Sequence, residues 1–78
     1  MLKIFSSDTC GYCRRLKAYL DEHRIMYDVI DVNESEENYR RLVKISGQTG
    51  IPVTLADNGE YVIGFDIEEI NRLTGICK

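Results

Sequence analysis

Residues 8–14 read DTCGYCR and join a strand pattern to a helix pattern. The four residues 2–5 (LKIF) are β-prone and are followed by polar residues, which predicts a first strand. From residue 11 to about residue 24, apolar side chains recur at helical spacing. The two cysteines of this stretch therefore stand directly after a predicted strand and at the start of a predicted helix.

Downstream of this unit, the chain repeats the strand-to-helix pattern once. Residues 26–32 (MYDVIDV) carry apolar side chains at both odd and even positions, which point to opposite faces of a strand. This pattern predicts a second strand covered on both faces. Asn33 is a good N-cap, and Glu36 three residues later fits a capping-box start. The predicted helix then ends at Gly47, a typical residue for leaving a helix.

The last third of the chain predicts a hairpin and a final helix. Asn58-Gly59 separates the β-prone run 51–55 from the run 61–63, and this dipeptide is a strong hairpin signal. Asp66 caps a helix that ends at Gly75. The order is β-α-β-α-β-β-α, with the first two strands parallel because crossovers are right-handed. We expect one α/β domain over residues 1–78, with a four-stranded mixed sheet flanked by helices.

Composition limits the classes of function. The chain has 78 residues and a net charge of −3, which argues against nucleic acid or an acidic membrane as the main partner. Three cysteines do not make the even framework of a small secreted protein. The apolar start is too short for a signal peptide, and no stretch approaches the ~20 apolar residues of a membrane span. We therefore expect a cytoplasmic protein.

Three chemistries fit a pair of cysteines two residues apart. Zinc needs four ligands, and only His23 and Cys77 remain as isolated candidates, so we expect no metal. A structural disulfide across so small a loop would add little stability. A lone CxxC beside a β-α-β pattern is typical of a redox-active pair, and we favour this interpretation.

Position in the helix assigns the roles of the pair. Cys10 lies at the helix start, where unpaired N–H groups favour a thiolate, so we expect it to be the nucleophile. Cys13 lies one turn further, on the apolar face with Leu16 and Leu20. We expect it to be the resolving thiol that attacks the mixed disulfide.

Three separated motifs resemble the glutaredoxin family over nearly the whole chain. They are TCGYC at 9–13, GIPV at 50–53, and Gly64-Phe65-Asp66. The resemblance implies a thioredoxin fold, a monomer, and a thiol-disulfide oxidoreductase that reduces protein or glutathione mixed disulfides. It also implies that Pro52 follows a cis peptide bond, which turns the Ile51 backbone towards the active site.

The same resemblance implies a substrate site and an electron donor. The residues expected to contact glutathione or substrate are Tyr12, Gln48, Thr49, Ile51, Pro52, Phe65 and Asp66. No tightly bound cofactor is implied, and glutathione is the expected reductant or co-substrate. The partners are disulfide-containing proteins, together with glutathione or a reductase.

Departures from the family pattern concern the donor. Ser7 and Thr49 stand where glutaredoxins commonly carry cations, and Gly64-Phe65 with Glu68 resembles the GF-x-x-D pattern of ribonucleotide reductase donors. Those proteins are reduced by thioredoxin reductase, which gives an alternative donor. A module that binds metal or an Fe–S cluster through Cys10 is the alternative of another class.

Three further residues carry plainer expectations. Tyr39 and Tyr61 fit the spacing of packing groups. Cys77, next to the last residue, is expected to be an exposed, incidental thiol, or else to enter a mixed disulfide or link two chains.

Overall fold

Four strands and three helices make up the computed structural model, which describes residues 1–76. The elements are β1 (Leu2–Ser6), α1 (Gly11–Glu22), β2 (Tyr27–Asp31), α2 (Glu36–Ser46), β3 (Val53–Leu55), β4 (Tyr61–Ile63) and α3 (Ile67–Thr74). This order confirms the predicted β-α-β-α-β-β-α sequence of elements. Cys77 lies outside the described residues.

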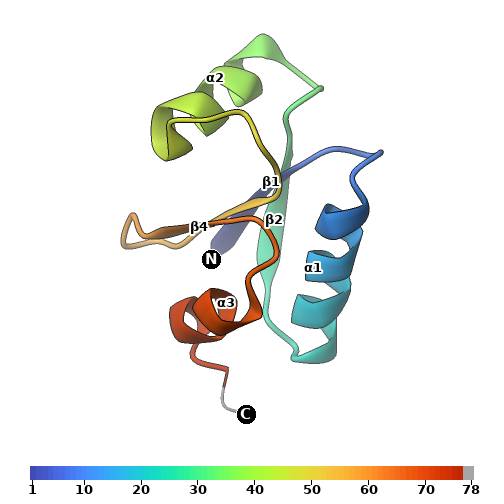
Figure 1. Ribbon diagram of the computed structural model, residues 1–78, viewed down its shortest axis with the longest axis vertical. Helices are drawn as coiled ribbons and strands as arrows, with labels where there is room; N and C mark the ends of the chain where they lie inside the picture. Colours follow the sequence, from blue (N-terminus) through green and yellow to red (C-terminus); the bar gives the residue numbers. More distant parts are fainter. Residues whose placement is uncertain (77–78) are drawn as a thin grey trace.

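The strands form a single mixed sheet in the order β2-β1-β3-β4. β1 pairs with β2 in parallel, with Ile4 opposite Val29. β1 also pairs with β3 in the antiparallel sense, and β3 continues through the hairpin into antiparallel β4. Both predicted relations, the parallel first pair and the antiparallel hairpin, are confirmed (Figure 1).

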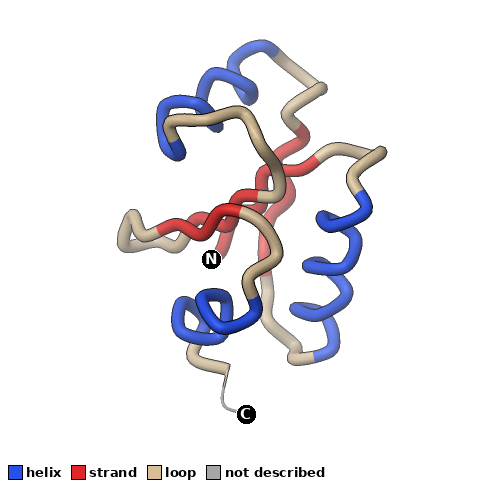
Figure 2. Tube along the Cα trace, viewed as in Figure 1, coloured by secondary structure: helices blue, strands red, loops and turns tan. Residues whose placement is uncertain are grey.

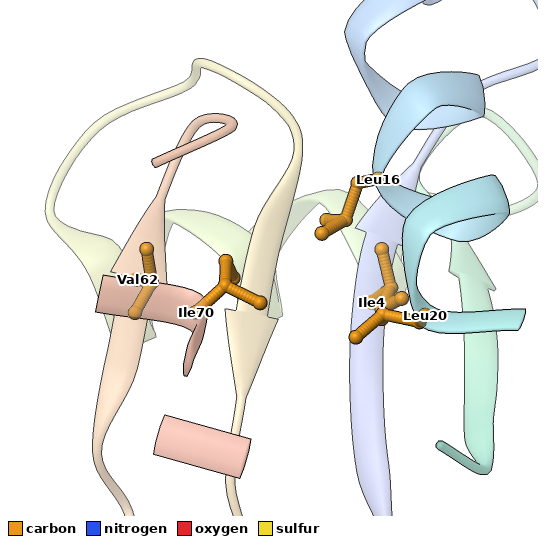
Figure 3. Packing of buried hydrophobic residues seen from close by; sticks show 5 residues of the cluster. All are labelled: Ile4, Leu16, Leu20, Val62 and Ile70. Carbon is orange, nitrogen blue, oxygen red and sulfur yellow. The ribbon is translucent and has the colours of Figure 1, made fainter. Parts of the chain in front are cut away.

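Helices cover both faces of this sheet (Figure 2). α1 and α3 lie on one face and α2 lies on the other. Ile4 and Phe5 are neighbours on the central strand β1, so their side chains point to opposite faces. Ile4 packs with α1, α3 and β4 through Leu16, Leu20, Val62 and Ile70 (Figure 3). Phe5 packs on the α2 side with Val32, Leu42 and Val53.

Helix ends follow the local signals in most places. The Asp66 carboxylate accepts the Glu69 N–H at 3.3 Å and caps α3. Gly47 and Gly75 end α2 and α3 in the left-handed conformation, at φ of 70° and 77°, which glycine adopts without steric cost. α1 is shorter than predicted, since it ends at Glu22.

The predicted cap of α2 is wrong. Ser35, two residues after Asn33, is the N-cap, and its hydroxyl accepts the Asn38 N–H at 3.1 Å. Asn33 instead lies in the preceding turn, where its N–H donates to the Asp31 carboxylate at 2.8 Å. Serine and asparagine cap helices about equally well, so the local pattern alone did not separate the two positions.

Two expectations about burial are not fully met. Tyr27 and Ile30 of β2 pack into the clusters on opposite faces of the sheet, as predicted, but Val29 of this edge strand is 48% exposed. Tyr39 and Tyr61 remain 43% and 42% exposed, so they are not core residues. One helix, α2, is too narrow to cover the whole of its sheet face, and strand β4 therefore keeps part of its outer face open.

No helix within residues 1–76 combines the length and the apolar character needed to cross a membrane. The longest, α1, has 12 residues.

Candidate active site

Cys10 is the N-cap of α1, at the point where the chain leaves β1 and turns into the helix. Its backbone is extended, with φ −90° and ψ 111°, and its thiol sulfur accepts the Cys13 N–H at 3.2 Å. A side chain that caps a helix satisfies one of the otherwise unpaired N–H groups of the first turn. The sulfur therefore sits at the positive end of the helix dipole, an environment that favours a thiolate. The side chain is partly exposed.

Cys13 lies in the first turn of α1 and is fully buried. The pKa of the Cys13 thiol is raised to about 12, mainly by burial and in addition by the interaction with Cys10. The Ser7 backbone and the charge of Lys17 act in the opposite direction and lower the pKa. At neutral pH Cys13 is therefore a protonated thiol, while Cys10 is the sulfur open to solvent.

A segment 41 residues away completes the surroundings of Cys10. The Ile51 carbonyl oxygen lies 4.0 Å from the Cys10 sulfur, as expected from the sequence. The Ile51–Pro52 peptide bond is cis, which confirms that prediction. The Gly64 N–H donates to the Pro52 carbonyl at 2.7 Å, so the loop before α3 is fastened to the same segment. Three loops meet here: β1–α1, the loop before β3, and the loop after β4.

The other residues predicted to contact glutathione or substrate differ in exposure and in hydrogen bonding. Tyr12 is 60% exposed beside Cys10. Thr49 is exposed and lies two residues before Ile51. The Gln48 amide is occupied locally, because it donates to the Ser46 hydroxyl and the Gly50 carbonyl, both at 3.0 Å. Gln48 therefore shapes the loop, and a ligand would have to compete with these bonds.

Phe65 and Asp66 occupy the start of the α3 region. Phe65 is half-buried against the core, and its ring meets the Tyr19 ring edge-on with centroids 6.3 Å apart. Asp66 is exposed while its carboxylate caps α3. The Gly64–Pro52 hydrogen bond joins this segment to the active-site loop, but Phe65 turns mainly inward.

The sequence reasoning missed one arrangement. The Arg15 guanidinium lies over the Tyr12 ring, 5.6 Å from its centroid. Cation–π contacts form within about 6 Å of a ring centroid. The two residues are three apart on a helix, and this spacing was the signal that would have predicted the contact. Among residues 1–76, no group of three or more His, Cys, Asp or Glu side chains is arranged to hold a metal ion.

The buried state of Cys13 gives a pH-dependent prediction. With a pKa of about 12, its thiolate fraction is roughly one in ten thousand at pH 8 and rises about tenfold per pH unit. In a variant with Cys10→Ser and Cys77→Ser, burial remains as the largest cause of the raised pKa. We expect the rate of iodoacetamide labelling of Cys13 to rise about tenfold per pH unit from pH 8 to 10. Labelling in urea is the control, and a plateau below pH 9.5 in the folded protein would contradict the assignment.

Comparison with known proteins places these features in context. A family model described as glutaredoxin matches residues 2–62. A glutaredoxin-like 8.6 kDa protein of Clostridium pasteurianum is 37% identical over 75 residues, which cover 94% of this chain and 96% of that protein. The glutaredoxin-like protein NrdH of Lactococcus lactis is 29% identical over 73 residues, covering 94% and 99%.

Among solved structures, a mutant of a thioredoxin-like protein superposes with a TM-score of 0.89 and 26% identity. The superposition covers 97% of this chain and 96% of that one. The sheet order, the helices on both faces and this superposition confirm the predicted thioredoxin fold.

Proposed function

The chain belongs to the glutaredoxin family and is a thiol-disulfide oxidoreductase, and we propose that Cys10 is its nucleophile and Cys13 its resolving thiol. The asymmetry between the two sulfurs is the observation that carries this proposal. Cys10 is partly exposed and caps α1, whereas Cys13 is fully buried and has a raised pKa. Of these two sulfurs, only that of Cys10 is both accessible to a substrate disulfide and placed at a helix start that stabilises a thiolate.

In the first step, the Cys10 thiolate attacks one sulfur of a substrate disulfide. A disulfide forms between Cys10 and the substrate, the substrate S–S bond breaks, and the departing sulfur takes a proton from solvent. The Ile51 carbonyl oxygen lies 4.0 Å from the Cys10 sulfur, so backbone groups of this segment lie beside the reacting sulfur. A substrate in extended conformation can pair with them, as in strand addition.

In the second step, Cys13 loses its proton and attacks the Cys10 sulfur. The Cys10–Cys13 disulfide forms, and the second substrate sulfur leaves as a thiolate, so the substrate gains two electrons and the protein loses two. Part of the raised pKa of Cys13 comes from Cys10 itself. That part disappears once Cys10 is in the mixed disulfide, so Cys13 becomes easier to deprotonate when it is needed. The charge of Lys17 favours the same deprotonation.

Regeneration needs two electrons from a thiol donor, and we propose glutathione as this reductant or co-substrate. Two glutathione thiols would reduce the Cys10–Cys13 disulfide and leave as glutathione disulfide. The proposed contacts are the Ile51 backbone, the exposed Tyr12 ring, Thr49 and the Asp66 cap region.

A second candidate donor is thioredoxin reductase, because the charges around the site do not favour an anionic donor such as glutathione. Glutathione carries a net negative charge, but Ser7 and Thr49 are uncharged and the Gln48 amide is engaged in its own loop. Asp66, Glu68 and Glu69 follow within five residues of Gly64, whose N–H donates to the Pro52 carbonyl. These features weaken electrostatic attraction for an anionic tripeptide.

A coupled assay tests the donor. NADPH oxidation with bis(2-hydroxyethyl) disulfide is compared between glutathione plus glutathione reductase and thioredoxin reductase alone. We expect turnover with glutathione, and we expect Thr49→Arg to lower its KM by about threefold, since an exposed ion pair is worth up to about 1 kcal/mol. Turnover with thioredoxin reductase and none with glutathione would reject glutathione as the donor. The Cys10→Ser variant gives the background rate.

A further inference from the structure

We propose that Gly11, Tyr12 and Arg15 form a docking site for an acidic side chain of a protein substrate, next to the disulfide that Cys10 attacks. This inference rests on the proposed function and deepens it, because it names the class of substrate. The three residues line a surface depression, the α1 hollow.

The α1 hollow is a surface depression of about 340 Å³ on the side of Cys10 where α1 begins. Gly11 leaves it open, since a Cβ added at this position would meet no atom within 4 Å. Tyr12 forms a rigid wall that is 60% exposed. Arg15 lies over the Tyr12 ring, so the guanidinium is held beside the depression rather than free in solvent.

Arg15 is also available for a ligand. Within the described part of the chain it makes no ion pair, whereas Arg40 and Arg72 are paired with glutamates. Its neighbour Arg14 is engaged differently, because its guanidinium donates to the Asp8 carbonyl at 3.3 Å. A guanidinium that rests on an aromatic ring keeps donors for a carboxylate and loses little entropy when it binds one.

The charge distribution selects an acidic partner on this side only. Residues 9–20 contain three cations and no acid, although the whole chain carries −3. The cap and first turn of α3, which follow the loop bonded to Pro52, are acidic instead, with Asp66, Glu68 and Glu69. A substrate segment with a carboxylate would therefore be drawn to the α1 hollow and repelled from α3, which fixes its direction across Cys10.

The experiment compares two cyclic disulfide peptides that differ in the residues flanking their cysteines, which are aspartate in one and asparagine in the other. Pre-reduced protein is mixed with each peptide in a single turnover, so no electron donor is required. Acid quenching and chromatography give the second-order rate constant. Each value is divided by the rate constant with dithiothreitol, which corrects for the intrinsic reactivity of the peptide.

We expect the aspartate peptide to react about threefold faster at low salt, the scale of one exposed ion pair, and the advantage to fade at high salt. Arg15→Gln should bring the ratio between the peptides to about one, while the matched variant Arg14→Gln should keep most of it. If both variants lose the preference for the aspartate peptide equally, net charge rather than the α1 hollow sets that preference, and the proposal is overturned.

Three other results would each lead to a different conclusion. Equal rates for the two peptides in the parent protein would overturn the docking site and leave the proposed function intact. A loss in Arg15→Gln confined to glutathione disulfide would assign Arg15 to glutathione and overturn the protein-substrate proposal. If neither peptide reacts with the parent, the proposed function fails and the docking site fails with it.

Discussion

Replacing Cys10 by serine is expected to lower turnover on every disulfide substrate by about a thousandfold or more, the scale on which enzymes lose activity with their nucleophile. A serine hydroxyl at the start of α1 would still cap the helix, because its oxygen can accept the Cys13 N–H as the sulfur does at 3.2 Å. The fold should therefore persist while the nucleophile is lost. The coupled NADPH assay measures the activity, and circular dichroism confirms that the variant is folded.

Cys13→Ser is the matched control, and its effect depends on the substrate. On a peptide carrying one glutathione in mixed disulfide, attack by Cys10 releases the peptide, and a second glutathione then reduces Cys10 directly. We expect Cys13→Ser to retain this activity. On a protein disulfide that needs two thiols, the same variant should stop at a covalent Cys10–substrate complex, visible by mass spectrometry without reductant.

The two variants separate the roles of the sulfurs. Equal activity of Cys10→Ser and the parent would reject Cys10 as nucleophile. Loss of both activities in Cys13→Ser would show that Cys13 is needed before the mixed disulfide is resolved, contrary to the order of steps proposed above.

Ile4→Ala is expected to lower the free energy of unfolding by about 3 kcal/mol, within the range for buried Ile-to-Ala changes. Ile4 is fully buried in the central strand β1 and packs against Leu16 and Leu20 of α1 (Figure 3). A domain of this size has a total stability of roughly 4–12 kcal/mol, so the loss is a large fraction of it. Thermal unfolding should shift down by about 15 °C, as followed by circular dichroism.

Ile63→Ala provides the matched control, because Ile63 is the same residue type in a strand of the same sheet but is 46% exposed. We expect it to lower the stability by less than about 1 kcal/mol. If Ile4→Ala does not fold, Ile4→Val still tests the packing, with an expected loss of about 1 kcal/mol. Similar losses at positions 4 and 63 would contradict the burial of Ile4 as the cause.

Much of the fold was predictable because its signals are local. Asp66 as a cap, Gly47 and Gly75 as helix ends, and Asn58-Gly59 as a hairpin each act through the backbone of a few neighbouring residues. The roles of these residues do not depend on distant contacts, so the pattern of the chain is sufficient to find them.

The errors about burial have a physical cause that the sequence does not display, because burial depends on which elements pack against one another. The apolar pattern of 26–32 looks the same in a central strand and in an edge strand, and only the sheet order places β2 at the edge. Tyr61 on β4 is exposed because α2 covers only part of its sheet face, and Tyr39 is a 43% exposed residue of α2 itself. In the choice between Asn33 and Ser35, two equally good caps competed and the sequence did not rank them.

For the active site, the sequence by itself determined the reactive pair: two cysteines one turn apart at a helix start, the first exposed and the second on the apolar face. That information is local, because helix periodicity and the helix terminus fix it. Tertiary structure alone decided what surrounds the pair. The Arg15–Tyr12 contact is local, since the two residues are three apart on α1. Packing β3 against β1, however, brings Ile51 across 41 residues to Cys10, and no local pattern specifies that contact.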